Sequence, residues 1–261
     1  MRRNGSNILK YKISFIVIMV MILSFFVSCA SVSTESHPYS EEENEKAVEA
    51  IRLLMDRTST AAPENMFVAK ADLTQLDMYL PQTAQGIVGE LDIIPGFRTE
   101  CRKWLDIVHS ICASISLTIP EVLDEAITTV WIADPQAIVL GPTTSSTSLL
   151  DTACSDHLEA ELQQTLRQRL ADKTGDSQSA DEIWGRIIIK YNIWRTAQMN
   201  LSHYSGRTVP QEVSGDVSEH LARLICDMFF TQMAIEEDAI RTTPRPQDDS
   251  IIAEVFAFPM Q

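Results

Sequence analysis

Apolar residues recur every three or four positions along most of the chain, which is the spacing of one face of an α-helix. In the first half, this pattern predicts a helix that begins at Glu41 and ends before Pro63. It predicts further helices over 97–116 and 120–131. A short helix should start at Asp134, because Asp followed by Pro is typical of a helix N-terminus.

The second half of the chain continues the helical pattern. Ser155 is expected to cap a helix on which leucine recurs every fourth residue, at Leu158, Leu162, Leu166 and Leu170. Ser179 and Glu182 form a capping-box pair, so another helix should begin between them. The most hydrophobic helix follows Asp216. No part of the mature chain alternates as a strand does, so we predict an all-α, multi-helix single domain over 45–257.

The N-terminus has the pattern of an export signal. Basic residues come first, an uncharged run over 13–28 follows, and small residues end it. This run is shorter than the roughly 20 residues that a membrane-spanning helix needs. We therefore expect 1–28 to be a signal peptide and 29–44 to be a flexible tether; the alternative is an uncleaved anchor.

The end of that run, Phe26-Val27-Ser28-Cys29, resembles the lipobox of bacterial lipoproteins. The resemblance implies that the thiol of Cys29 receives a diacylglyceryl group, that the peptide bond before it is cut, and that the new amine is often acylated, for example with palmitate. Two or three acyl chains suffice to hold a protein in a lipid bilayer. We expect an exported domain, anchored to the cell membrane or outer membrane and facing the periplasm or the cell surface.

Composition and charge indicate a globular protein and argue against nucleic-acid binding. The chain is 45% hydrophobic and 22% charged. These fractions are typical of a globular protein. The formal net charge of −15 leaves no basic patch for a nucleic-acid backbone, so we expect no nucleic-acid partner.

Apart from Cys29, the cysteines are Cys101, Cys112, Cys154 and Cys226. Export permits disulfides without requiring them, and four thiols allow three pairings. Cys101 and Cys112 lie about 16 Å apart on a continuous helix, at about 1.5 Å per residue, so they should not bridge each other. The disulfide state and the oligomeric state stay open.

A series of elements occurs in this order along the chain: 119–127, 134–141, Thr147, 236–241 and 251–256, with Tyr191-Asn192 between Thr147 and 236. Together, these elements resemble the DUF4197 family. The resemblance covers about residues 45–256 and implies an exported, often lipid-anchored, largely helical single domain with no recognised catalytic set. Pro135 and Pro142 depart from the family pattern around the short helix that follows Asp134.

Two groups of residues contain the side-chain types found in acid/base or metal-binding sites. Glu236 and Glu237 with Arg241 could form an acid/base group in a cleft, but an ion pair between Glu237 and Arg241 that fixes the C-terminal segment explains the same pattern. Cys154 and His157 are zinc-ligand types, but two ligands do not make a zinc site. We expect no metal, no cofactor and no enzymatic activity.

Trp184, Tyr191 and Trp194 form an aromatic stripe that could line an apolar pocket, although core packing is the commoner reason for such a stripe. The resulting hypothesis is an envelope lipoprotein with a binding or scaffolding role, whose partner is an envelope protein or an apolar ligand. The alternatives are a carrier of a lipid or apolar ligand and a membrane-active protein that uses amphipathic helices.

Overall fold

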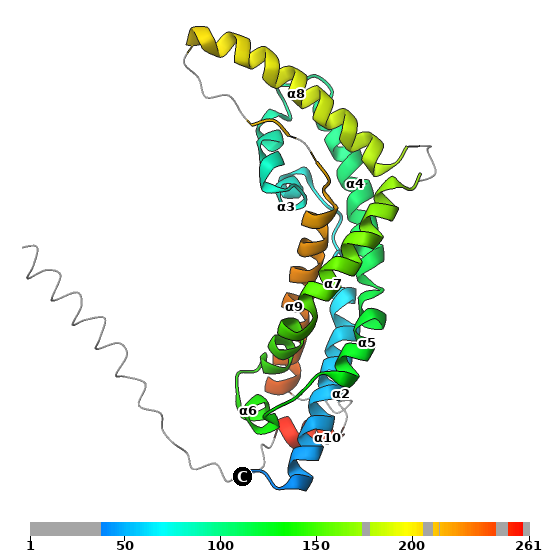
Figure 1. Cartoon of the computed structure of the whole chain (residues 1–261), viewed down its shortest axis with the longest axis vertical. Helices are drawn as coiled ribbons and strands as arrows, with labels where there is room; N and C mark the ends of the chain where they lie inside the picture. Colours follow the sequence, from blue (N-terminus) through cyan, green and yellow to red (C-terminus); the bar gives the residue numbers. More distant parts are fainter. Residues whose placement is uncertain (1–37, 174–177, 206–210, 214, 244–249, 258–261) are drawn as a thin grey trace, which may run out of the picture. The chain divides into compact units, whose positions relative to one another are not determined.

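A computed structural model of the chain describes residues 38–173, 178–205, 211–213, 215–243 and 250–257 (Figure 1). The predicted signal peptide, Cys29 and the tether up to residue 37 lie outside these residues. The described part is helical and contains no β-strand, which confirms the predicted all-α fold. Its α-helices are α2 (Glu41–Asn65), α3 (Leu76–Tyr79), α4 (Phe97–Ser116), α5 (Ile119–Thr129), α6 (Pro135–Leu140), α7 (Ser145–Ala171), α8 (Ala180–Ser205), α9 (Ser218–Thr242) and α10 (Ser250–Ile252), and its other turns are η1 (Leu73–Gln75), η2 (Gln82–Glu90) and η3 (Ala253–Ala257).

The long helices pack around one continuous apolar core within the unit Tyr39–Met260. Helix α9 packs on both α7 and α2, and α5 packs on α2 and α7 (Figure 1). Helix α8 packs mainly on α4. Buried side chains from every long helix meet in this core, for example Ile51, Trp104, Leu150, Ile187 and Phe229.

Several helix ends follow from local sequence. Helix α4 has the predicted bounds at both ends. The Asp134 carboxylate accepts a hydrogen bond from the backbone N–H of Ala137 at 2.9 Å, so it caps α6 as expected. At the start of α8, the Ser179 hydroxyl accepts from the Glu182 N–H at 3.1 Å, and the Glu182 carboxylate accepts from the Ser179 N–H at 3.3 Å. The predicted capping box is confirmed.

Two predicted helix ends are wrong. Helix α2 continues to Asn65, with the buried Pro63 inside its last turn. A proline so close to the end removes only one backbone hydrogen bond of the helix, and burial of its ring favours the position. Helix α7 begins at Ser145, so Ser155 lies in its interior rather than at its cap. The cause is a tertiary contact from Glu237, described below.

One helical stretch in the described part, Phe97–Thr129, is long and apolar enough to cross a membrane by length and composition. It comprises α4 and α5. In the domain part of its apolar surface serves the core, because Trp104, Leu105 and Val108 are buried and α4 and α5 pack on α8 and α2, whereas Leu117 is exposed.

The four cysteines of the domain are free and buried. Burial raises the pKa of the thiol to about 12 in Cys101, Cys112 and Cys226 and to about 11 in Cys154. Since the thiolate is the reactive form, these side chains behave as small apolar groups at neutral pH.

Candidate functional site

Part of the connection between α8 and α9 lies alongside α8. The Asn192 amide donates to the backbone carbonyl of Val213 at 2.8 Å and accepts from the Val213 N–H at 3.2 Å. Further along, the Trp184 indole N–H donates to the carbonyl of Gly215 at 3.0 Å. Residues 211–213 and 215–217, here called the return segment, therefore run antiparallel to α8. Gly215 has a φ of 114°, a conformation that glycine adopts most readily.

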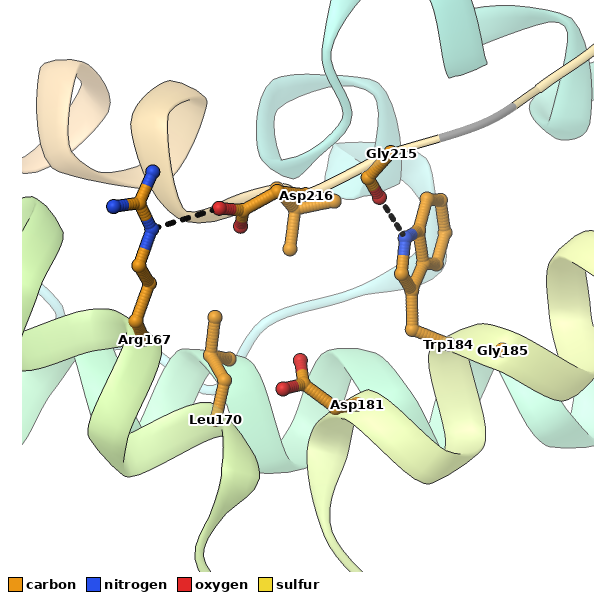
Figure 2. Close-up of a pocket in the computed structure, with 8 residues that line it drawn as sticks. Arg167, Leu170, Asp181, Trp184, Gly185, Gly215 and Asp216 are labelled. Carbon is orange, nitrogen blue, oxygen red and sulfur yellow. Dashed lines mark hydrogen bonds and ion pairs between the residues drawn. The ribbon is translucent and has the colours of Figure 1, made fainter.

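A pocket of about 260 Å³, here called the Trp184 pocket, lies where α7, α8 and the return segment meet (Figure 2). Each of the three contributes polar and apolar surface. The residues around it are Arg167 and Leu170 from α7, Asp181, Trp184 and Gly185 from α8, and Gly215, Asp216 and Val217 from the return segment.

Asp216 is held in place by two hydrogen bonds. Its carboxylate accepts from the N–H of Ser218, the first residue of α9, at 2.7 Å, and from Arg167 Nε at 2.9 Å. Burial alone would raise the pKa of Asp216, but the bonds from Ser218 and Arg167 outweigh it, and the pKa is lowered. Asp216 therefore stays ionised at neutral pH.

Asp181 is the second carboxylate of the pocket. Figure 2 shows it pointing into the space between Leu170 and Trp184. Within the described part of the chain, no hydrogen bond or ion pair engages this carboxylate. Burial, and then the negative charge of Asp216, raise the pKa of Asp181. A cation placed between the two carboxylates would relieve the repulsion that contributes to this shift.

The aromatic stripe divides between the pocket and the core. Trp184 borders the pocket, and its ring stacks on Trp104 with centroids 4.9 Å apart, which fixes its orientation. Tyr191 is buried beside Trp194, with ring centroids 5.9 Å apart. Neither of these two lines the pocket.

Glu237 lies at the other end of α7, and its side chain is 0% exposed. Its carboxylate accepts hydrogen bonds from the N–H groups of Ser146 and Thr147 at 3.0 and 2.8 Å and from the Thr147 hydroxyl at 2.7 Å. These N–H groups belong to the first turn of α7, where a helix has no backbone acceptors of its own. Glu237 therefore caps α7 from a distant part of the chain.

Arg241 completes this buried group. Its guanidinium contacts Glu237 at 3.1 Å, with the Arg241 side chain only 5% exposed. It also stacks over the ring of Phe256 at 4.8 Å. Its remaining donors bond the carbonyls at the end of α6, namely those of Ile138, Val139, Gly141 and Pro142. The expected ion pair is present, and it joins α6, α7, α9 and η3.

Glu236 does not join this pair. Its carboxylate accepts from the Asn65 side chain at 2.9 Å and from Gln232 at 3.0 Å, so it faces α2. Glu236, Glu237 and Arg241 thus do not converge on one cleft. The carboxylate of Glu237 is surrounded by donors, as a helix cap requires.

Cys154 and His157 are also separated. Cys154 is buried, and its thiol is directed to the carbonyl of Leu150, whereas His157 is exposed beside Glu161 at 3.8 Å. Among the described residues, no group of three or more His, Cys, Asp or Glu side chains is placed to hold a metal ion.

Comparison with known proteins gives a family. The sequence model described as "Protein of unknown function (DUF4197)" matches residues 43–257. The chain belongs to the DUF4197 family. No curated protein and no solved structure matches the chain.

Two elements that carry the DUF4197 resemblance now have structural roles. The Asn of the Tyr191-Asn192 pair holds the return segment, and the Glu237 and Arg241 of the 236–241 element form the buried group. Sequence reasoning did not find Arg167, Asp181 and Asp216 as neighbours. Asp216 two residues before Ser218 was the available signal, because an Asp there commonly bonds the free N–H groups at a helix start.

Proposed function

We propose that this DUF4197 protein is a lipid-anchored envelope protein whose helical domain binds an alkylammonium group in the Trp184 pocket. The observation that carries the binding role is the Asp181 carboxylate, which faces the pocket without a partner in the described chain and lies near the ionised Asp216. Asp181 is exposed at the edge of the pocket, and two carboxylates that repel each other favour an opposite charge beside them.

The other lining residues fit the same ligand. Leu170, Val217 and the edge of Trp184 offer apolar surface for the methylene groups of an alkyl chain. Arg167 is already engaged by Asp216, so it does not compete for Asp181. The net charge of −15 attracts cations over a longer range.

The size of the pocket favours a small ligand. Its volume of about 260 Å³ is below that of the pockets that hold drug-sized molecules, and a diacyl lipid needs more space still. A free amine and a lysine side chain of an envelope protein share the chemistry that this pocket would recognise. If the ligand is the lysine of another envelope protein, the domain acts as a scaffold.

The membrane anchor is the second part of the proposal, and it rests on the lipobox-like sequence at Cys29. Mass spectrometry of the N-terminal peptide of the chain, produced with its leader, should find Cys29 at the new N-terminus carrying acyl chains. Cys29→Ser should lose this mass and leave the membrane fraction. An unmodified Cys29 in a membrane-bound chain would contradict this part.

Calorimetric titration tests the binding role, with butylamine as the probe and butanol and butyrate as probes that lack the positive charge. Butylamine should bind, and the other two should not. Asp181→Asn should weaken butylamine binding about tenfold or more, because a hydrogen bond to a charged group contributes about 1.5–3 kcal/mol. Glu121→Gln removes the same charge from an exposed position on α5 and should have no such effect.

A second pair of variants tests the place of binding. A Cβ added at Gly185 would meet no atom of another part of the fold within 4 Å, so Gly185→Leu should fold and place its side chain in the pocket that Gly185 lines. Gly89 has the same open space but lies outside the pocket, so Gly89→Leu is the matched control. Butanol binding as well as butylamine, or Gly185→Leu leaving butylamine affinity unchanged, would contradict the proposal.

The two sources of the ammonium group can then be separated. Native mass spectrometry of the protein purified from its own membranes would show a small mass, lost on denaturation, if the ligand is a free amine. Acetyl-lysine-amide binding as tightly as butylamine, with no small mass retained, would favour a protein lysine.

A further inference from the structure

Trp131 is the most exposed large apolar side chain in the described part of the chain, at 81%. Its neighbours Val130 and Ile132 are buried, so the backbone is held on the core while the indole faces outward. Leu140, at the end of the short helix α6, is exposed as well. Core packing does not account for an indole in this position.

A chain of contacts places this region at the end of the domain where the polypeptide enters α2. Lys46, near the start of α2, pairs with Glu254 of η3. Phe256 of η3 stacks under Arg241, which bonds the carbonyl of Val139 in α6. Figure 1 shows α6 and α10 beside the first turns of α2.

Trp131 belongs to the same end. It precedes Pro135, the first residue of α6, by four positions. Four residues of extended chain reach at most about 14 Å. Trp131 is therefore within about 14 Å of the start of α6, and α6, which carries the exposed Leu140, packs on α2.

The length of the tether limits how far the start of the folded unit can lie from Cys29. Cys29 precedes Tyr39, the first residue of the folded unit, by ten positions. At most about 35 Å of chain therefore separates the two residues. We infer that this end of the domain, which carries the exposed Trp131 and Leu140, rests in the interface of the bilayer that holds Cys29. This inference rests on the proposed lipid anchor.

The chemistry of this end selects the kind of lipid surface. Trp side chains favour the boundary between headgroups and hydrocarbon, because the ring is apolar and its N–H is polar. Glu41, Glu42 and Asp134 are exposed near the same end, so an anionic bilayer would repel it. This end therefore suits zwitterionic headgroups.

This inference gives the domain a defined orientation relative to the bilayer. The acyl chains supply the attachment, and Trp131 determines which end of the domain faces the lipid. The Trp184 pocket borders the other half of α7. Arg167 is about 30 Å from Thr147 along the helix, at about 1.5 Å per residue, so the pocket is held away from the bilayer.

Tryptophan fluorescence of the lipidated full chain tests this orientation. The protein is bound to vesicles of phosphatidylcholine whose acyl chains are brominated near the headgroup, because bromine quenches an indole that it contacts. Quenching should be clear for the wild-type chain and lost in Trp131→Phe. Trp194→Phe, which removes a partly buried indole of α8, should keep it. Adding phosphatidylglycerol should reduce the quenching.

The outcomes separate the orientation from the anchor. A wild-type chain that floats with the vesicles without quenching, or whose quenching persists in Trp131→Phe, would overturn the orientation and leave the anchor intact. A chain that does not float with the vesicles, and behaves as Cys29→Ser does, would overturn the anchor and this inference with it. Because Trp131 is exposed, its replacement should leave the helical circular dichroism unchanged.

Discussion

Each end of α7 has an acid–base pair beside it, and the two pairs differ in how deeply they are buried. Near its N-terminus, Glu237 and Arg241 are 0% and 5% exposed, and their polar atoms are engaged by backbone groups as well as by each other. Toward its C-terminus, Arg167 and Asp216 are 59% and 48% exposed, and they meet through one hydrogen bond. A buried ion pair needs a hydrogen-bond partner for each of its polar atoms. An exposed ion pair does not, because water can supply the missing partners.

The difference indicates which end can bind a ligand. The buried pair has its geometry fixed by four elements, and a ligand would have to replace bonds that the fold depends on. The exposed pair stands beside Asp181, whose carboxylate is still available to a cation. The buried pair and the proposed binding pocket are thus separated by about 30 Å along one helix, at about 1.5 Å per residue.

The largest expected effect is the loss of the buried cation. Arg241→Met should lower the free energy of unfolding by about 3–5 kcal/mol, because it leaves the Glu237 charge buried without its partner. Chemical denaturation at neutral pH measures the change. The matched variant is Arg167→Met, which removes the exposed cation and should cost about 1 kcal/mol or less. Equal losses in the two variants would contradict the distinction between the two ends.

A smaller effect should follow from removing one donor to Glu237. Thr147→Val keeps the side-chain shape but loses the hydroxyl that donates to the carboxylate at 2.7 Å. The expected loss is about 1.5–3 kcal/mol, as for a hydrogen bond to a charged group. Thr147→Ser retains the hydroxyl and should lose less. If Thr147→Ser is as unstable as Thr147→Val in the same denaturation experiment, the methyl group rather than the hydrogen bond stabilises the cap.

Local sequence was enough to predict the helices but not the start of α7. Both ends of α4 and the capping box of α8 depend on residues within a few positions of each other. The N-terminal turn of α7 depends on Glu237, which is 90 residues from Thr147 along the chain. Side-chain spacing within α7 carries no trace of that contact, so the N-cap was predicted at Ser155 instead of Thr144, eleven residues too late.

The candidate site shows the same limit. Trp184 could be named from the aromatic stripe, because its spacing on one helix is visible in the sequence. The carboxylates that give the pocket its charge, Asp181 and Asp216, lie on different segments, and only the path of the return segment brings them together. That path depends on Asn192, whose role as a two-way hydrogen-bond partner cannot be read from its neighbours.

The smallest expected effect concerns the exposed pair and its dependence on pH. Asp216 has a lowered pKa in the folded state, so its ionised form stabilises the fold above the unfolded pKa, and that stabilisation is lost as pH falls through the lower, folded value. Asp216→Asn should therefore cost about 0.2–1 kcal/mol at neutral pH, a small value because both partners are about half exposed. Below the folded pKa the variant and the wild type should be equally stable. Thermal unfolding measured from pH 7 downward checks both statements. A difference that grows as the pH falls would mean that Asp216 stabilises the start of α9 mainly in its protonated form, and the exposed pair would then contribute nothing as an ion pair.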